Sequence, residues 1–126
     1  MSKKDTFATA MTEGYTFKGE ALVLGGAMLD GDVPEGALVK VPLRTMNRHG
    51  LIAGATGTGK TKTLQVITEQ LALSGVPTLL MDIKGDLSGL AAPGTTNPKI
   101  EARHVKLGLP YVPEALPVEL LSLSDE

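Results

Sequence analysis

The chain has 126 residues and a net charge of −2, and hydrophobic residues make up 42% of it. This length suits one domain that buries about two-thirds of its unfolded surface. Because there is no cysteine, a disulfide framework and a thiolate metal site are both excluded. Neither half of the chain is strongly basic, so these residues alone do not indicate nucleic-acid binding. No signal peptide and no apolar run of membrane-spanning length is evident. We therefore expect a cytoplasmic protein without membrane contact.

The first third of the chain predicts two small units. Residues 1–19 start polar and predict a peripheral arm that contains a short helix. Residues 20–45 predict a small β-hairpin, because two apolar stretches, 20–24 and 37–43, flank a segment rich in turn residues. The acids of that segment, 30–36, do not follow the calcium-loop pattern, so we interpret it as a turn.

Residues 54–61 fit the pattern G-x-x-x-x-G-K-[ST] of a phosphate-binding P-loop. Glycines allow the backbone to approach a phosphate closely, and successive N–H groups then form an anion-binding nest. Lys60 is predicted to reach the β- and γ-phosphates, and the Thr61 hydroxyl to bind Mg²⁺. A dinucleotide-binding turn is the nearest alternative, but its third glycine is missing, since Lys62 stands in that place. The predicted nucleotide-binding residues are Gly54, Ala55, Thr56, Gly57, Thr58, Gly59, Lys60, Thr61 and Lys62.

The surroundings of this loop predict an α/β fold. Residues 51–53 form a short apolar run typical of a buried parallel strand. Apolar residues then recur at helical spacing between Lys60 and about Ser74, and residues 77–83 read as a second strand. A strand, a helix and a strand at this spacing predict a βαβ unit with parallel strands. Residues 46–126 are therefore predicted to be the first part of a P-loop NTPase domain with an incomplete parallel-sheet core.

Asp82 ends the second predicted strand. Ligands of parallel sheets bind beyond the carboxyl ends of the strands, so Asp82 is predicted to face the Mg²⁺ shell directly or through water. The alternative is a carboxylate that caps a turn, and Gly85 just after it is compatible with that role. The sequence leaves both roles open.

The last part of the chain is rich in proline and predicts little regular structure beyond a short helix over residues 98–106. Residues 118–123 read as a third strand. Asp125 and Glu126 follow it in the manner of a metal-binding aspartate and a catalytic glutamate. However, two serines interrupt the run, whereas a central parallel strand is buried on both faces. We therefore expect nucleotide binding with hydrolysis near background, and we assign no catalytic residue.

Two segments, residues 46–52 leading into the loop and residues 81–90, resemble the bacterial HerA-like ATPases, particularly the YjgR-like group of the HerA/FtsK superfamily. The resemblance implies a RecA-like core, ATP with Mg²⁺ as cofactors, and assembly into a homo-oligomeric, hexameric ring with helicase or translocase work. It carries over phosphate and Mg²⁺ roles to Gly54, Gly57, Gly59, Lys60 and Thr61, with Asp82 and Lys84 nearby.

Relatives of this kind are several times longer than the chain. Their hydrolytic Asp-Glu strand, sensor and arginine finger follow later, so we expect this chain to be the amino-terminal piece of such an ATPase. DNA contacts are expected through segments that it does not contain.

Two other function classes stay open. One is a small P-loop kinase, although Arg103 is the only arginine that residues 88–126 offer for a lid. The other is a nucleotide-gated binding module without enzymatic activity.

Overall fold

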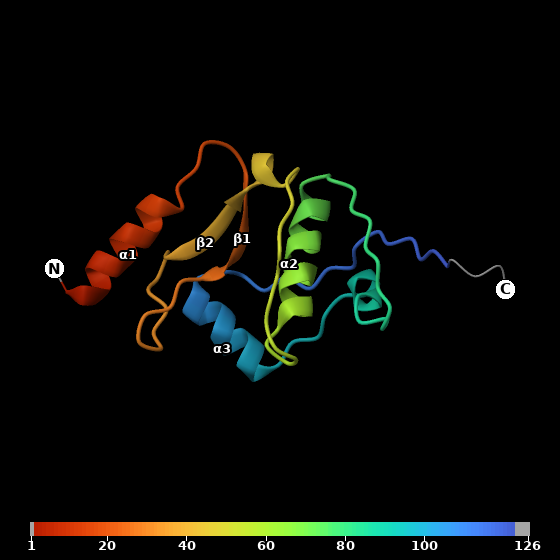
Figure 1. Ribbon diagram of the computed structural model, residues 1–126. Coiled ribbons are helices and arrows are strands. Elements are labelled where there is room, and N and C mark those ends of the chain that lie inside the picture. The colour runs from red at the N-terminus through yellow and green to blue at the C-terminus, as the bar shows by residue number, and fades with distance from the viewer. Residues whose placement is uncertain (1, 123–126) are drawn as a thin grey trace.

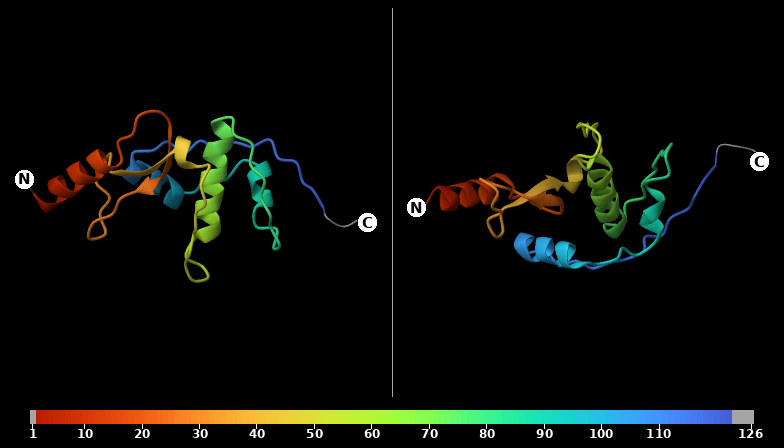
Figure 2. Two further views of the ribbon diagram at one scale, coloured as in Figure 1. Left: turned by 45° about the horizontal axis from the view of Figure 1, so that its top comes forward. Right: turned by 90° about the horizontal axis from the view of Figure 1, so that it is seen from below.

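A computed structural model describes residues 2–122 of the protein. The molecule is elongated, with α1 at one end and the C-terminal stretch at the other (Figures 1 and 2). Two 3₁₀ turns, η1 and η2, accompany the main elements. The elements in chain order are α1 (Lys3–Gly14), β1 (Ala21–Gly26), β2 (Leu38–Pro42), η1 (Leu43–Thr45), α2 (Lys60–Leu73), η2 (Ser88–Ala91) and α3 (Pro98–Leu107).

β1 and β2 form an antiparallel pair, as expected for residues 20–45. The register runs from Ala21 opposite Pro42 to Gly26 opposite Leu38, and it shifts between Val23 and Gly25. Such a shift is a β-bulge, which bends the strand and increases its twist.

The segment between the two strands contains the expected turn. Asp30 and Gly31 both have positive φ, and the residues on either side exchange two backbone hydrogen bonds. Positive φ at both central positions is typical of a tight turn built on Asp-Gly.

Helix α2 packs on β1 through a side-chain amide. The Gln70 Oε1 accepts a hydrogen bond from the Val23 N–H, and its Nε2 donates to the Val23 carbonyl at 2.6 Å. The amide thus satisfies both backbone groups at the open edge of β1, where an unpaired strand would otherwise need a neighbour. The buried hydrophobic residues among those described are few: Leu22, Ala27, Ala37, Leu71 and Leu87.

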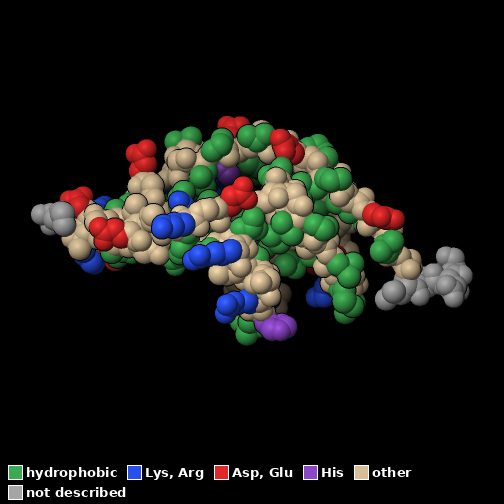
Figure 3. Space-filling model, turned by 90° about the horizontal axis from the view of Figure 1, so that it is seen from above, with side chains coloured by type: hydrophobic (Ala, Val, Ile, Leu, Met, Phe, Trp, Pro, Cys, Tyr) green, Lys and Arg blue, Asp and Glu red, His purple; other side chains and the backbone are tan. Residues whose placement is uncertain are grey.

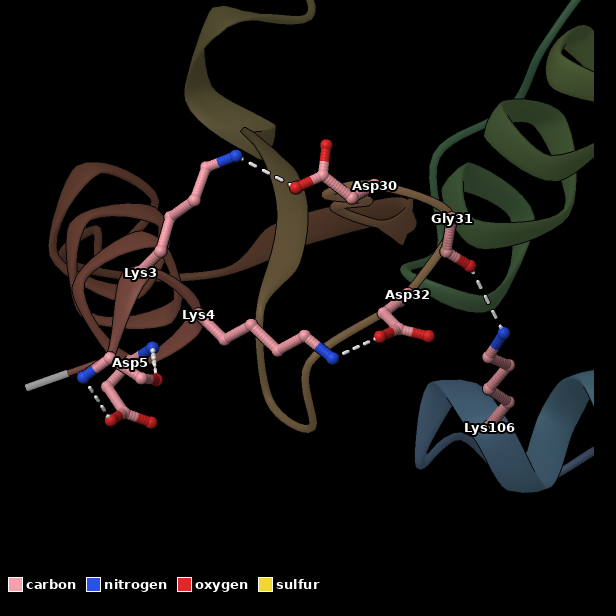
Figure 4. A network of polar contacts seen from close by, with 8 residues as sticks. Lys3, Lys4, Asp5, Asp30, Gly31, Asp32 and Lys106 are labelled. Atoms are coloured by element: carbon pink, nitrogen blue, oxygen red, sulfur yellow. Dashed lines mark hydrogen bonds and ion pairs between the residues drawn. The ribbon is translucent and has the colours of Figure 1, made fainter.

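Two ion pairs join helix α1 to the turn between the strands. Lys3 Nζ lies 2.8 Å from a carboxylate oxygen of Asp30, and Lys4 pairs with Asp32. Lys106 of α3 donates to the Gly31 carbonyl in the same turn, so the turn between the strands joins both helices (Figure 4). All four charged side chains of the two ion pairs are exposed, and exposed ion pairs contribute little stability. The assignment of residues 1–19 as a peripheral arm stays a prediction.

The parallel sheet expected for residues 46–126 is not formed in the part of the chain that the structure describes. Residues 51–53 and 77–83 belong to no strand, and neither do residues 118–122. Leu51 is 90% exposed and Met81 is 86% exposed, whereas parallel strands are buried on both faces. The physical reason is that a strand needs hydrogen-bonded neighbours, and residues 2–122 place none beside these segments. Hydrophobic side chains consequently lie open on the surface (Figure 3). The tail from residue 123, including Asp125 and Glu126, lies outside the described residues.

Within residues 2–122, no helix has the length and apolar character needed to cross a membrane.

Candidate functional site

The loop before α2 has a backbone that only glycine adopts easily. Gly57 has a φ of 80° and Gly59 a φ of 93°, both in the left-handed region. At Gly54 a Cβ would lie 2.6 Å from the Thr58 hydroxyl, so a side chain there would push that hydroxyl away from the Ala55 carbonyl to which it donates. The three glycines of the motif therefore meet specific steric demands of the folded loop.

Two side chains meet inside the loop at the Ala55 carbonyl oxygen. The Lys60 ammonium and the Thr58 hydroxyl each donate a hydrogen bond to it at 2.7 Å. The lysine side chain therefore folds back toward the loop. A phosphate oxygen bound there would replace the carbonyl as the partner of the ammonium group, with a stronger charge-assisted hydrogen bond.

The first turn of α2 is left open to a ligand. Its N-cap residue, Gly59, has no side chain to accept a hydrogen bond from the helix N–H groups, and no acidic residue lies in the first turn. The other two α-helices do have side-chain caps, a Ser2 capping box on α1 and the Asn97 carbonyl on α3. Uncapped N–H groups and the positive end of the helix dipole favour an anion. Thr61 and Lys62 belong to this exposed turn.

The turn that contains Asp82 is tied to the same helix. The Gln65 amide donates to the Asp86 carbonyl at 3.0 Å, and Leu87 beside it is buried. Gln65 lies one helical turn beyond Thr61, so the segment with Asp82 packs against the part of α2 that follows the loop. Sequence reasoning missed this joint, because nothing in the local pattern distinguishes an amide that faces a carbonyl from one that faces water.

The carboxylate of Asp82 caps its own turn. One oxygen accepts a hydrogen bond from the Lys84 N–H at 3.0 Å, and the other accepts one from the Leu87 N–H at 2.8 Å. The hydrogen bond from Leu87 is the main cause that lowers the pKa of Asp82 below its usual value. These are the contacts of the capping alternative. The role of Asp82 as a Mg²⁺ ligand stays a prediction.

The residues present suit Mg²⁺ only together with a phosphate. No group of three or more His, Asp or Glu side chains among the described residues is arranged to hold a metal ion. Mg²⁺ keeps several waters and is commonly bound by one or two protein oxygens plus substrate phosphates. A Mg²⁺ site that combines Thr61 and Asp82 therefore stays a prediction.

The comparisons with known proteins identify the family. The family model for the HerA-like helicase C-terminal domain matches residues 28–126. The chain belongs to this HerA-like family. The matched residues include the loop, α2 and the Asp82 turn. No curated protein and no solved structure matches the chain. The matched family is a C-terminal one, so placement as the amino-terminal piece of a bacterial, YjgR-like ATPase stays a prediction of the sequence.

Proposed function

We propose that this chain binds ATP with Mg²⁺ through residues 54–62, as the nucleotide-binding part of a HerA-like ATPase. The observation that carries the proposal is the loop itself, in which glycine-dependent torsions, the inward Lys60 ammonium and an uncapped helix start occur together. Membership of the HerA-like family supports the same function.

Each part of the loop has a defined task in this proposal. Backbone N–H groups of the loop bind phosphate oxygens, and Lys60 neutralises charge at the β- and γ-phosphates. The Thr61 hydroxyl would bind Mg²⁺, and the bound ion would neutralise the remaining negative charge of the phosphates. We assign no catalytic residue to this chain. Ring assembly, DNA translocation and a cytoplasmic location are expectations from the family and extend the proposal to the assembled ATPase.

Isothermal titration calorimetry with ATP, ADP and adenosine tests the proposal. The parent chain is expected to bind ATP and ADP but not adenosine, because the site is argued to bind phosphate. Lys60→Ala is expected to weaken ATP binding about ten- to a hundredfold, the effect of losing a charge-assisted hydrogen bond of roughly 1.5–3 kcal/mol.

A matched control is Lys99→Ala, since Lys99 lies in the first turn of α3, a helix with a side-chain cap. Its ATP affinity should equal that of the parent. Unchanged binding by Lys60→Ala, or equal binding of adenosine and ATP by the parent, would refute the proposed function.

A further inference from the structure

A cavity of about 440 Å³ lies on one face of α3. The residues that α3 and its cap contribute to the lining recur at i, i+3, i+4 and i+7, the spacing of a single helical face. They are Glu101, His104, Val105 and Gly108. The other walls come from the chain just before the helix and just after it. The volume lies within the range of small-molecule sites.

Hydrogen bonds fold the chain after α3 back onto this face. Gly108 ends the helix with a φ of 65°, in the left-handed region, and the Leu109 N–H donates to the His104 carbonyl at 3.2 Å. The His104 ring adds a second contact, because its Nδ1 lies 3.1 Å from the Leu109 carbonyl oxygen. The Tyr111 hydroxyl donates to the Thr95 carbonyl at 3.1 Å, which joins the segments before and after the helix (Figure 2). The walls of the cavity are therefore tied to one another.

The hydroxyl and ring N–H donors of the lining side chains already have partners. The Thr96 hydroxyl donates to Glu101 Oε1 at 3.1 Å. The His104 Nδ1 carries a hydrogen, because the carbonyl oxygen that it contacts only accepts. Pro110 and Pro113 have no N–H to offer. These side chains therefore leave acceptors for a ligand, namely the second Glu101 oxygen and, in the neutral imidazole, the His104 Nε2.

The positive charges of α3 lie away from the cavity. None of the described residues around the cavity is a lysine or an arginine. Lys99, Arg103 and Lys106 are spaced i, i+4 and i+7, so they share the opposite face of the helix. Lys106 extends toward the turn between the strands, where it donates to the Gly31 carbonyl (Figure 4). The Glu101 carboxylate is therefore the charge that a ligand would meet.

We propose that this cavity binds a guanidinium group on an aliphatic stem. The proposal is independent of the phosphate site. A planar guanidinium carries five N–H donors, so it can donate to Glu101 and His104, one helical turn apart, while the carboxylate balances its charge. The Tyr111 ring also lines the cavity, and the faces of aromatic rings attract cations. Val105 and Leu109 supply apolar surface for the methylene groups of the stem.

Titrating the isotope-labelled chain with butylguanidinium, followed by NMR, tests the proposal. We expect saturable shifts of the amide resonances of His104, Leu109 and Tyr111, because these residues line the cavity. Butylurea has nearly the same shape but carries no charge and has a carbonyl oxygen where the cation has a donor. It should therefore leave these resonances in place.

A pair of variants tests the role of the carboxylate. Glu101→Gln removes the charge but keeps an oxygen that accepts from the Thr96 hydroxyl. It should weaken butylguanidinium binding about three- to tenfold, because Glu101 is exposed and water screens its attraction for a cation. The matched control is Glu13→Gln, which changes an exposed glutamate on α1. That variant should bind butylguanidinium with the affinity of the parent.

A blocked glycine pentapeptide with a central arginine separates two sources of the guanidinium group. Tighter binding of the peptide than of butylguanidinium at the same resonances identifies the side chain of another protein, whereas the reverse identifies a free small molecule. The proposal is refuted if butylguanidinium causes no saturable shifts, or if butylurea causes the same ones. Equal affinities of Glu101→Gln and Glu13→Gln for butylguanidinium would refute it as well.

Discussion

The Lys60 ammonium already lies inside the loop that precedes it, 2.7 Å from the Ala55 carbonyl oxygen. If the loop binds a phosphate, as we propose, the ammonium would exchange this carbonyl for a phosphate oxygen. The surrounding torsions explain why the motif is rich in glycine, since Gly57 and Gly59 occupy the left-handed region. At the scale of single residues, these torsions and this lysine contact are the observations behind the proposed phosphate site.

Asp82 gives a prediction that depends on pH. Its pKa is lowered because the Leu87 and Lys84 N–H groups stabilise the charged form. A lowered carboxylate pKa contributes stability that is present above the unfolded value of about 3.9 and is lost as the pH falls through the folded pKa. We therefore expect the amide resonances of Lys84 and Leu87, followed by NMR, to shift with a midpoint below about pH 3.9.

The matching variant is Asp82→Asn, which should abolish that titration and lower the melting temperature, because one of the two backbone hydrogen bonds loses its acceptor. Unchanged Mg²⁺-dependent ATP binding in this variant would assign Asp82 to the turn alone. A loss of Mg²⁺ dependence at an unchanged melting temperature would contradict the capping role and favour the metal role.

Different parts of helix α2 contact different segments of the chain. Its first turn forms the candidate site, Gln65 in its middle ties down the turn after Asp82, and Gln70 near its end joins β1. The helix begins at Lys60, and after Ser74 the chain turns at Gly75 with a φ of 75°. One element therefore connects the two-stranded sheet to the loop, so a change in its packing acts on both.

Thr68 offers a test of that packing. Its side chain is buried at 7% exposure, and its hydroxyl finds no hydrogen-bond partner in the part of the chain that the structure describes. Burying a hydroxyl without a partner costs about 1–3 kcal/mol, so Thr68→Val should raise the free energy of unfolding by about 1–2 kcal/mol. Urea unfolding followed by circular dichroism measures the change through the midpoint.

Thr63→Val serves as the control, because the Thr63 hydroxyl does have a partner, the Gly59 carbonyl at 3.3 Å. That variant should not be stabilised. A midpoint for Thr68→Val at or below that of the parent would show that the hydroxyl is satisfied in solution.

Considered as a whole, the molecule leaves much apolar surface uncovered. Leu79, Met81 and Ile83 alternate along residues 77–83 and are at least 80% exposed. Contiguous apolar patches on soluble proteins usually mark surfaces that bind another chain or a ligand. The alternation with period two is also what a strand would present to a neighbour.

We expect the chain to self-associate in solution through this segment. Sedimentation velocity should show an average mass that rises with protein concentration. Replacing Leu79, Met81 and Ile83 together with Ser should suppress the rise. A control is Val105→Ser, because Val105 is equally exposed but lies on α3. A parent chain that stays monomeric at all concentrations would contradict this prediction.

Local features of the chain were predictable from the sequence, because they depend on short-range physics. The start of α2 at Lys60 and its end near Ser74 follow from helix signals, and the left-handed torsions before α2 fall on glycines. Phosphate binding by that loop stays a prediction. The antiparallel pair and the short helix near residues 98–106 were also predicted, and the structure contains both.

Only the tertiary structure decided which segments have partners. Residues 51–53 and 77–83 have the composition of buried strands, yet no neighbouring strand covers them among residues 2–122, and they stay exposed. The joints at Gln65 and Gln70 and the hydrogen bond from the Tyr111 hydroxyl to the Thr95 carbonyl likewise connect groups that the local pattern does not bring together. The physical reason is that torsional preference acts within a few residues, whereas burial and hydrogen-bond partners depend on the position of the rest of the chain.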